Sequence, residues 1–281
     1  MSIKLTILAA GVAAPIALTG SAGLKDAQVA DDGFVAIRES TIAYRLPGEF
    51  TRAGRPVEAP VEKMRVGAIS MMRYQVTNAE YARCVADRAC PPTTEPAARP
   101  DRPAVKVSWR DAEAYAAWMS RTTGTFYRLP TDAEWVAAAG SRFNDERIAA
   151  APSADPSRLW LARYEQESAR RAAADTGAQP QGHFGANENG VVDLAGNVWE
   201  WTSTCYRRLA LDTEAETVNC GVRVVEGRHR SYMTDFIRDP RSGGCAVGTP
   251  PENLGFRLVR VDNAWIAWRG ALERFLARLT S

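Results

Sequence analysis

Hydrophobic and polar positions alternate along two stretches in the first third of the chain. Residues 33–46 ("GFVAIRESTIAYRL") alternate with a period of two, which predicts a β-strand, and residues 62–76 ("EKMRVGAISMMRYQV") have a similar character. The stretch between them, 47–60, is polar and rich in Pro and Gly, which predicts a loop. The chain is therefore expected to begin its fold with strands and to form helices later.

Three helices are predicted by the same start signal, in which an acid follows a hydroxyl residue by three positions. The pairs are Thr77 with Glu80, Ser108 with Asp111, and Thr131 with Glu134. Glycine is the residue that most often ends a helix, and Gly124 and Gly140 are placed to end the second and third. One face of the second helix carries apolar residues at helical spacing and should be buried: Ala112, Tyr115, Ala116 and Met119.

The second half of the chain is less regularly patterned. Residues 141–178 are rich in Ala, Arg and Ser and predict a long surface excursion, whereas 179–260 are rich in Gly, Pro and turns and predict loops. Residues 263–281 carry a broad apolar stripe, which predicts a C-terminal amphipathic helix. This helix is expected to dock on its own domain, with a membrane or a partner as the alternative. Because strands and helices mix without a βαβ rhythm, the predicted fold class is α+β.

The N-terminus has the layout of a secretory signal peptide. Lys4 precedes an apolar run at 5–18, and 20–22 are small residues suited to cleavage, so 1–22 is predicted to be removed on export. An uncleaved membrane anchor is the alternative, but the run is shorter than the ~20 residues that span a bilayer, and Pro15 interrupts it. We therefore expect a periplasmic or secreted protein with no transmembrane segment after cleavage.

The balance of charge bears on the class of partner. With 35 Lys and Arg against 33 Asp and Glu, the net charge of +2 gives no reason to expect a nucleic-acid or anionic-membrane surface.

Export would also allow disulfides among the five cysteines. Four of them lie in two close pairs, so the local bonds Cys84–Cys90 and Cys205–Cys220 are favoured, although four cysteines allow three connectivities. Cys245 is then left over, either as a small buried side chain or as a reactive thiol.

Five phrases follow one another along the chain: "YQVTNAEYARC" (74–84), "PAVKVSWRDAEAYAAWMS" (103–120), "YRLPTDAEWVAAAG" (127–140), "GVVDLAGNVWEWT" (190–202) and "NLGFRLVR" (253–260). The series resembles the formylglycine-generating enzyme (sulfatase-modifying factor) family. The resemblance covers about 33–260 and implies a single, irregular, loop-rich α+β domain related to C-type lectins.

The resemblance does not carry over the family's copper site. Enzymes of this family oxidise a substrate cysteine to formylglycine, with a copper ion held by two cysteines that flank a His-x-Ser-Tyr run. In this chain the run is 229–232, but Arg228 and Met233 occupy the flanking positions. Neither residue supplies a thiolate, the ligand that selects Cu(I), so copper and sulfatase activation are not expected.

An iron site of the related sulfoxide synthases is excluded by counting. Those enzymes use three histidines, and this chain has only His183 and His229. A site of two histidines and one carboxylate remains an alternative.

One of the family's calcium sites resembles the set Asp193, Gly196, Val198 and Glu200. Two carboxylates and two backbone carbonyls are hard oxygen ligands of the kind that Ca²⁺ takes, so calcium is a predicted cofactor. The alternative is that Glu200 pairs with an arginine while Asp193 caps a turn. The family's other calcium site has no matching pair of residues in 157–168.

Residues 223–260 resemble, less specifically, exported accessory proteins encoded beside copper nitrite reductases (the NirV type). A second exported branch, the pyoverdine-maturation oxidoreductases, shares the fold, but no motif ties the chain to it. The predicted function is thus an exported accessory or maturation factor that binds a protein or small molecule in the family's groove. The alternative is a metal-dependent oxidoreductase with other ligands.

Two sets of residues are candidates for these roles. The candidate catalytic residues are His229, Ser231, Tyr232 and Cys245. The candidate ligand-binding residues are Arg230, Arg238 and Arg241.

Overall fold

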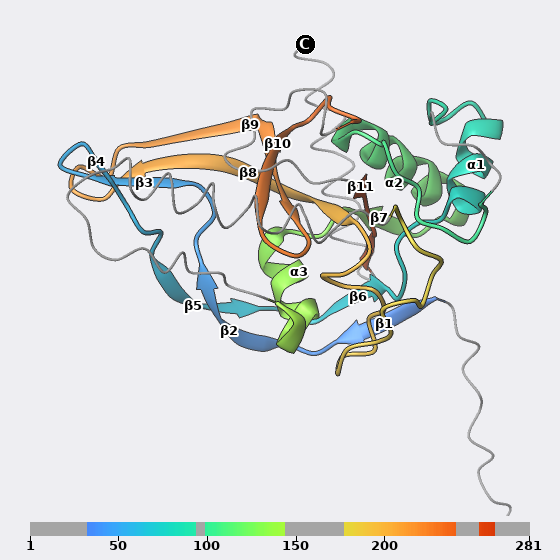
Figure 1. Cartoon of the computed structure of the whole chain (residues 1–281), viewed down its shortest axis with the longest axis horizontal. Helices are drawn as coiled ribbons and strands as arrows, with labels where there is room; N and C mark the ends of the chain where they lie inside the picture. The colour runs from blue at the N-terminus through green and yellow to red at the C-terminus, as the bar shows by residue number, and fades with distance from the viewer. Residues whose placement is uncertain (1–32, 94–98, 144–176, 240–252, 262–281) are drawn as a thin grey trace, which may run out of the picture. The chain divides into compact units, whose positions relative to one another are not determined.

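The computed structural model describes residues 33–93, 99–143, 177–239 and 253–261, all within one compact unit (Figure 1). The predicted signal peptide, most of the 141–178 excursion and the predicted C-terminal helix lie outside these residues, as do Arg241 and Cys245. Among the described residues, no helix is long and apolar enough to cross a membrane.

The three predicted helices are confirmed. In each, the capping hydroxyl accepts a hydrogen bond from the backbone N–H of the acid three residues on, and that carboxylate accepts one from the backbone N–H of the cap. Gly124 ends the second helix at φ 73°, in the left-handed region that glycine adopts without penalty. The helices are α1 (Asn78–Ala86), α2 (Trp109–Thr123) and α3 (Asp132–Ala139), and the short 3-10 helix Gly140–Arg142 follows α3.

The described strands form three sheets, which together with the helices confirm the α+β class. The first sheet has the order β1 (Phe34–Ile37), β6 (Ile69–Met72), β12 (Val259–Val261), β7 (Phe126–Arg128). The second has the order β10 (Ser231–Thr234), β9 (Glu216–Glu226), β8 (Trp199–Ala210), β3 (Glu49–Arg52), β4 (Arg55–Val57), and β11 (Leu254–Gly255) pairs parallel to β8 (Figure 1). β2 (Ser40–Arg45) and β5 (Val61–Val66) pair in the third.

Two stretches predicted as loops prove to contain strands. The polar stretch 47–60 contains the β3–β4 hairpin, whose turn residues Ala53 and Gly54 both have positive φ, as a two-residue type I′ turn requires. The turn-rich stretch 179–260 contains β8 and β9. The first four residues of β8, "WEWT", are all buried, so this strand shows no alternation by which a sequence pattern could find it.

Two apolar clusters fill the interior. The first lies under α1 and α2 and includes Tyr81, Tyr115 and both tryptophans of "NVWEW", Trp199 and Trp201. The second surrounds Trp135 of α3. The predicted face of α2 is buried as expected, with Met119 packed at the edge of the first cluster. Strands β8 to β10 of the larger sheet carry most of the candidate site.

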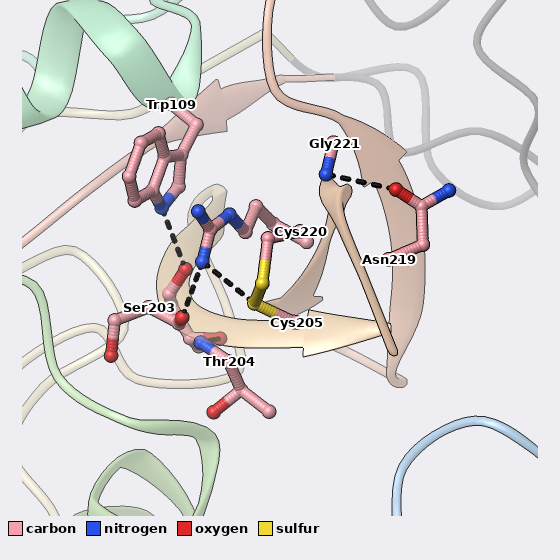
Figure 2. Close-up of a disulfide and its surroundings, with 9 residues drawn as sticks. Trp109, Ser203, Thr204, Cys205, Asn219, Cys220 and Gly221 are labelled. Atoms are coloured by element: carbon pink, nitrogen blue, oxygen red, sulfur yellow. Dashed lines mark hydrogen bonds between the residues drawn. A yellow bond between two sulfur atoms is a disulfide. The ribbon is translucent and has the colours of Figure 1, made fainter. Parts of the chain in front are cut away.

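Both predicted disulfides are present. Cys84–Cys90 closes the end of α1 and is buried in the first cluster. Cys205–Cys220 joins β8 to β9 beside Ser203 and Asn219, where the register between the strands shifts (Figure 2).

Candidate functional site

The His-Arg-Ser-Tyr run leads into β10, at the edge of the larger sheet, and its four side chains point to different surroundings. The ring of His229 packs edge-on against Trp199, with 5.3 Å between ring centroids, and its carbonyl accepts a hydrogen bond from the Trp199 Nε1 at 3.0 Å. Ser231 is buried. The Tyr232 hydroxyl accepts a hydrogen bond from the Gly48 N–H at 2.7 Å. The run is therefore held in place by packing and backbone bonds, and its side chains do not converge on one point.

Arg230 lies in a buried cluster of charged residues. Its Nε donates to the Glu226 Oε1 at 2.6 Å, and its Nη2 lies 2.8 Å from the Asp132 Oδ2. Its Nη1 donates to the Arg45 carbonyl at 2.7 Å, and the Tyr44 hydroxyl donates to the same Asp132 oxygen. The Arg230 guanidinium thus links β2, α3 and β9 in the interior, so its role in this structure is to hold the fold together.

The two acids of this cluster, Asp132 and Glu226, both pair with the same arginine, Arg230. Burial raises the pKa of Glu226 well above its usual range, and the neighbouring Asp132 carboxylate raises it further, against the lowering effect of Arg230. This favours a protonated Glu226 beside Asp132. Burial likewise raises the pKa of Tyr232, to about 12, so that its hydroxyl stays neutral.

A groove of about 460 Å³ lies over the larger sheet and is lined by residues of four neighbouring strands. The Tyr206 and Tyr232 rings meet edge-on, with 5.2 Å between centroids. Arg208 donates to the Tyr206 hydroxyl at 3.2 Å and pairs with Glu49 at 2.9 Å. Of the predicted site residues that the structure describes, Tyr232 alone is in the lining, which comprises Glu49, Tyr206, Arg208, Thr217, Asn219, Val222, Tyr232 and Thr234.

Arg238 lies outside this groove lining. Its Nε and Nη2 bind the two carboxylate oxygens of Asp111 at 2.7 and 2.9 Å. Next to it, Arg110 pairs with Asp235 at 3.0 Å. These two ion pairs fasten the turn after β10 to the first turn of α2. The structure therefore separates Arg238, Arg230 and Tyr232 into three different environments.

The predicted calcium ligand Glu200 is fully buried, and protein donors use both of its oxygens. Arg257 donates from Nε to Oε2 at 2.6 Å and from Nη2 to Oε1 at 2.7 Å. Gln75 Nε2 donates to Oε1 at 2.7 Å, and Trp135 Nε1 donates to Oε2 at 2.9 Å. The guanidinium of Arg257 supplies the positive charge that a cation would bring.

The carboxylate of Asp193 is used in the same way. Its two oxygens accept hydrogen bonds from the backbone N–H groups of Gly182 and Phe184 at 2.7 and 2.8 Å. Gly196 packs against the Phe184 ring so closely that an added Cβ would lie 2.8 Å from a ring carbon. Val198 is buried. The oxygens of both carboxylates are thus occupied by protein donors in this arrangement, which does not fit their use as calcium ligands.

No group of three or more His, Cys, Asp or Glu side chains within the described ranges is placed to hold a metal ion. The His183 ring lies edge-on to Phe184, with 4.8 Å between centroids.

The alternative stated for Glu200, a pair with an arginine, is what the structure shows, but the sequence did not identify that arginine as Arg257. Sequence reasoning also missed the other buried partners at these sites: Gln75, Asp132, Glu226 and Tyr44. The available signal was a charged residue inside an apolar run, as in "GFRLV", because a buried arginine requires an acid within reach.

Comparison with known proteins bears on both the family and the fold. Residues 26–262 match the family described as the sulfatase-modifying factor enzyme 1-like domain. The formylglycine-generating enzyme of Mycobacterium tuberculosis is 30% identical over 298 residues, covering 76% of this chain and 96% of that protein. The solved structure of PvdO from Pseudomonas aeruginosa matches with a TM-score of 0.52 at 22% identity, covering 81% of this chain and 93% of that one, which supports the fold.

Two other relatives are named as inactive. The inactive C-alpha-formylglycine-generating enzyme 2 of Mus musculus is 31% identical over 160 residues, covering 55% of this chain and 48% of that protein. The chain spans about half the length of this protein and of its counterpart in Bos taurus.

Proposed function

This chain belongs to the formylglycine-generating enzyme (sulfatase-modifying factor) family, and we propose that it acts there as an exported accessory or maturation factor that does not oxidise cysteine. In this role it binds a protein or small-molecule ligand in the groove over the larger sheet. We propose a copper nitrite reductase as the protein it supports, on the likeness of 223–260 to the NirV type.

The observation that carries the proposal is the surroundings of the two positions that flank the His-Arg-Ser-Tyr run. Met233 is fully buried in the first apolar cluster, and Arg228 is exposed. Neither offers a thiolate, and the four described cysteines are all in disulfides. The residues present therefore do not fit a copper ion held by two thiolates.

The groove supports a binding role because its lining combines aromatic rings with polar groups. Tyr206 and Tyr232 supply the aromatic rings, while Arg208 and Glu49 supply charges of both signs. Such a surface suits a ligand with apolar and polar parts, as a peptide segment has.

The absence of cysteine oxidation is tested directly. The purified chain is incubated with copper and a cysteine peptide that the Mycobacterium tuberculosis enzyme converts, and formylglycine is measured by mass spectrometry. We expect no product from this chain and conversion by the control enzyme. Formylglycine formed by this chain would overturn the proposal.

The groove is tested by a pair of adjacent exposed residues on β9. Thr217 lines the groove, whereas Val218, 55% exposed, does not. In a strain that lacks the chain, we expect T217R to fail to restore nitrite reductase activity and V218R to restore it. Full restoration by T217R would contradict binding in the groove. Unchanged nitrite reductase activity in the strain that lacks the chain would remove that enzyme as the client.

A further inference from the structure

The two disulfides lie in opposite surroundings. Cys84 and Cys90 are 0% and 6% exposed, within the first apolar cluster. In the other bond Cys220 is exposed and Cys205 is half-buried. Exchange requires a thiolate to reach a sulfur atom, so access alone makes Cys205–Cys220 the more reactive bond.

The Sγ of Cys205, the half-buried residue of this bond, lies beside the guanidinium of Arg223. The Nη1 of Arg223, the residue opposite Cys205 across the strand pair, lies 3.1 Å from the Cys205 Sγ and donates to the Ser203 carbonyl at 2.7 Å (Figure 2). The guanidinium carbon lies 3.9 Å from the ring centroid of Trp109, and the Trp109 Nε1 donates to the Thr202 carbonyl at 3.0 Å. The Trp109 ring and the Ser203 carbonyl together hold the Arg223 guanidinium against the Cys205 Sγ.

The charge of Arg223 is only partly compensated. Among the described residues no carboxylate lies within ion-pairing distance of it, and Glu113 and Asp235 act on it from further away. Burial lowers the pKa of this arginine, but a guanidinium remains charged at neutral pH. A fixed cation beside a sulfur favours the thiolate, and a thiol that forms its thiolate readily is a better leaving group.

We propose that Cys205–Cys220 is a thiol–disulfide exchange site for a cysteine thiolate of a protein or of a small thiol. The thiolate attacks the Sγ of Cys220, the exposed residue of the pair, and a mixed disulfide forms there. The Cys205–Cys220 bond breaks, and Cys205 leaves as a thiolate beside Arg223.

A partner with two thiols completes the reaction. Its second thiolate attacks its own sulfur in the mixed disulfide, and Cys220 leaves as a thiolate. The partner is oxidised to a disulfide by two electrons, and the Cys205–Cys220 pair is reduced to two thiols. Tyr206 and Asn219, the neighbours of these cysteines along the chain, line the groove, which gives a partner chain a place to lie. This activity is separate from the accessory role and stands without it.

The first experiment uses reduced glutathione on the purified chain. Samples are quenched over time, alkylated and mapped by mass spectrometry. We expect Cys205–Cys220 to open at least about ten times faster than Cys84–Cys90, with glutathione attached to Cys220. Equal rates, faster opening of Cys84–Cys90, or glutathione on Cys205 would overturn the proposal.

The second experiment tests the cation. We expect R223M to slow the opening of Cys205–Cys220 about threefold to tenfold at pH 7, and R223K to retain most of the rate. R207M is the matched control, because Arg207 lies on β8 two residues from Cys205 and pairs with Glu216 at 3.3 Å. In a C220S background, alkylation of Cys205 should require a higher pH once Arg223 is replaced by Met, which loss of packing alone would not cause. An unchanged rate and an unchanged pH profile in R223M would refute the role of the cation.

Discussion

At the scale of single residues, Arg257 is the side chain that compensates the buried negative charge of Glu200. Arg257 and Glu200 are both 0% exposed, and the guanidinium also donates to the carbonyls of Met72, Arg73 and Val192. Replacing Arg257 with Met leaves a buried carboxylate without its cation, so we expect a loss of about 3–5 kcal/mol in the free energy of unfolding.

This loss is measured by urea unfolding against a pair at the surface. Arg65 pairs with Glu39 at 2.7 Å, with both side chains exposed, and R65M should cost no more than about 1 kcal/mol. Equal losses in the two variants would show that Glu200 does not need Arg257.

Glu226 predicts a dependence of stability on pH. Its pKa is raised in the folded protein, so the native state holds a proton that the unfolded state releases at lower pH. The stabilisation is complete below the ordinary glutamate pKa and is lost as the pH rises through the raised value. E226Q imitates the protonated form, so its stability relative to the wild type should improve from pH 5 to pH 9.

Chemical unfolding at several pH values measures this difference. E216Q, at an exposed position of the same strand, is the control and should follow the wild-type curve. Parallel curves for E226Q and the wild type would contradict a raised pKa at Glu226.

At the scale of elements, the sequence could predict what local chemistry decides. The three helix starts were readable because the cap and the acid lie three residues apart and need no distant partner. The β3–β4 hairpin was missed because its first strand, β3, is stabilised by parallel pairing of residues 49–51 with 208–210 at the far end of β8. The start of β8 was missed because its first four residues are all buried, and β9 was missed because its first six are all exposed, so neither stretch shows the alternation that marks a strand.

The same limit applies to the candidate site. Tyr232 was found because the His-Arg-Ser-Tyr run is a local motif, and the structure places it in the groove. The partners of Arg230 could not be found, because Asp132 is 98 positions away in the sequence (230 − 132) and meets it only through the fold. Local motifs therefore identified the family, whereas the surroundings of each residue required the structure.

At the scale of the whole molecule, Glu200 and Asp193 decide whether the fold depends on calcium. The hydrogen-bond partners of Glu200 come from segments far apart along the chain: Gln75 after β6, Trp135 of α3 and Arg257 between β11 and β12. These hydrogen bonds already link the chain segments that a calcium ion would otherwise hold together. We therefore expect the melting temperature to stay within about 1 °C when calcium is added or is removed with EDTA.

If calcium did bind, the rise in melting temperature would be large enough to distinguish from no change. An ion present at a hundred times its dissociation constant stabilises the folded state by about 2.7 kcal/mol. For a domain of this size, that corresponds to a rise of roughly 5–10 °C in the melting temperature. Magnesium at the same ionic strength is the control for unspecific effects of salt. A calcium-specific rise of that size would contradict this expectation and support the calcium site predicted from the sequence.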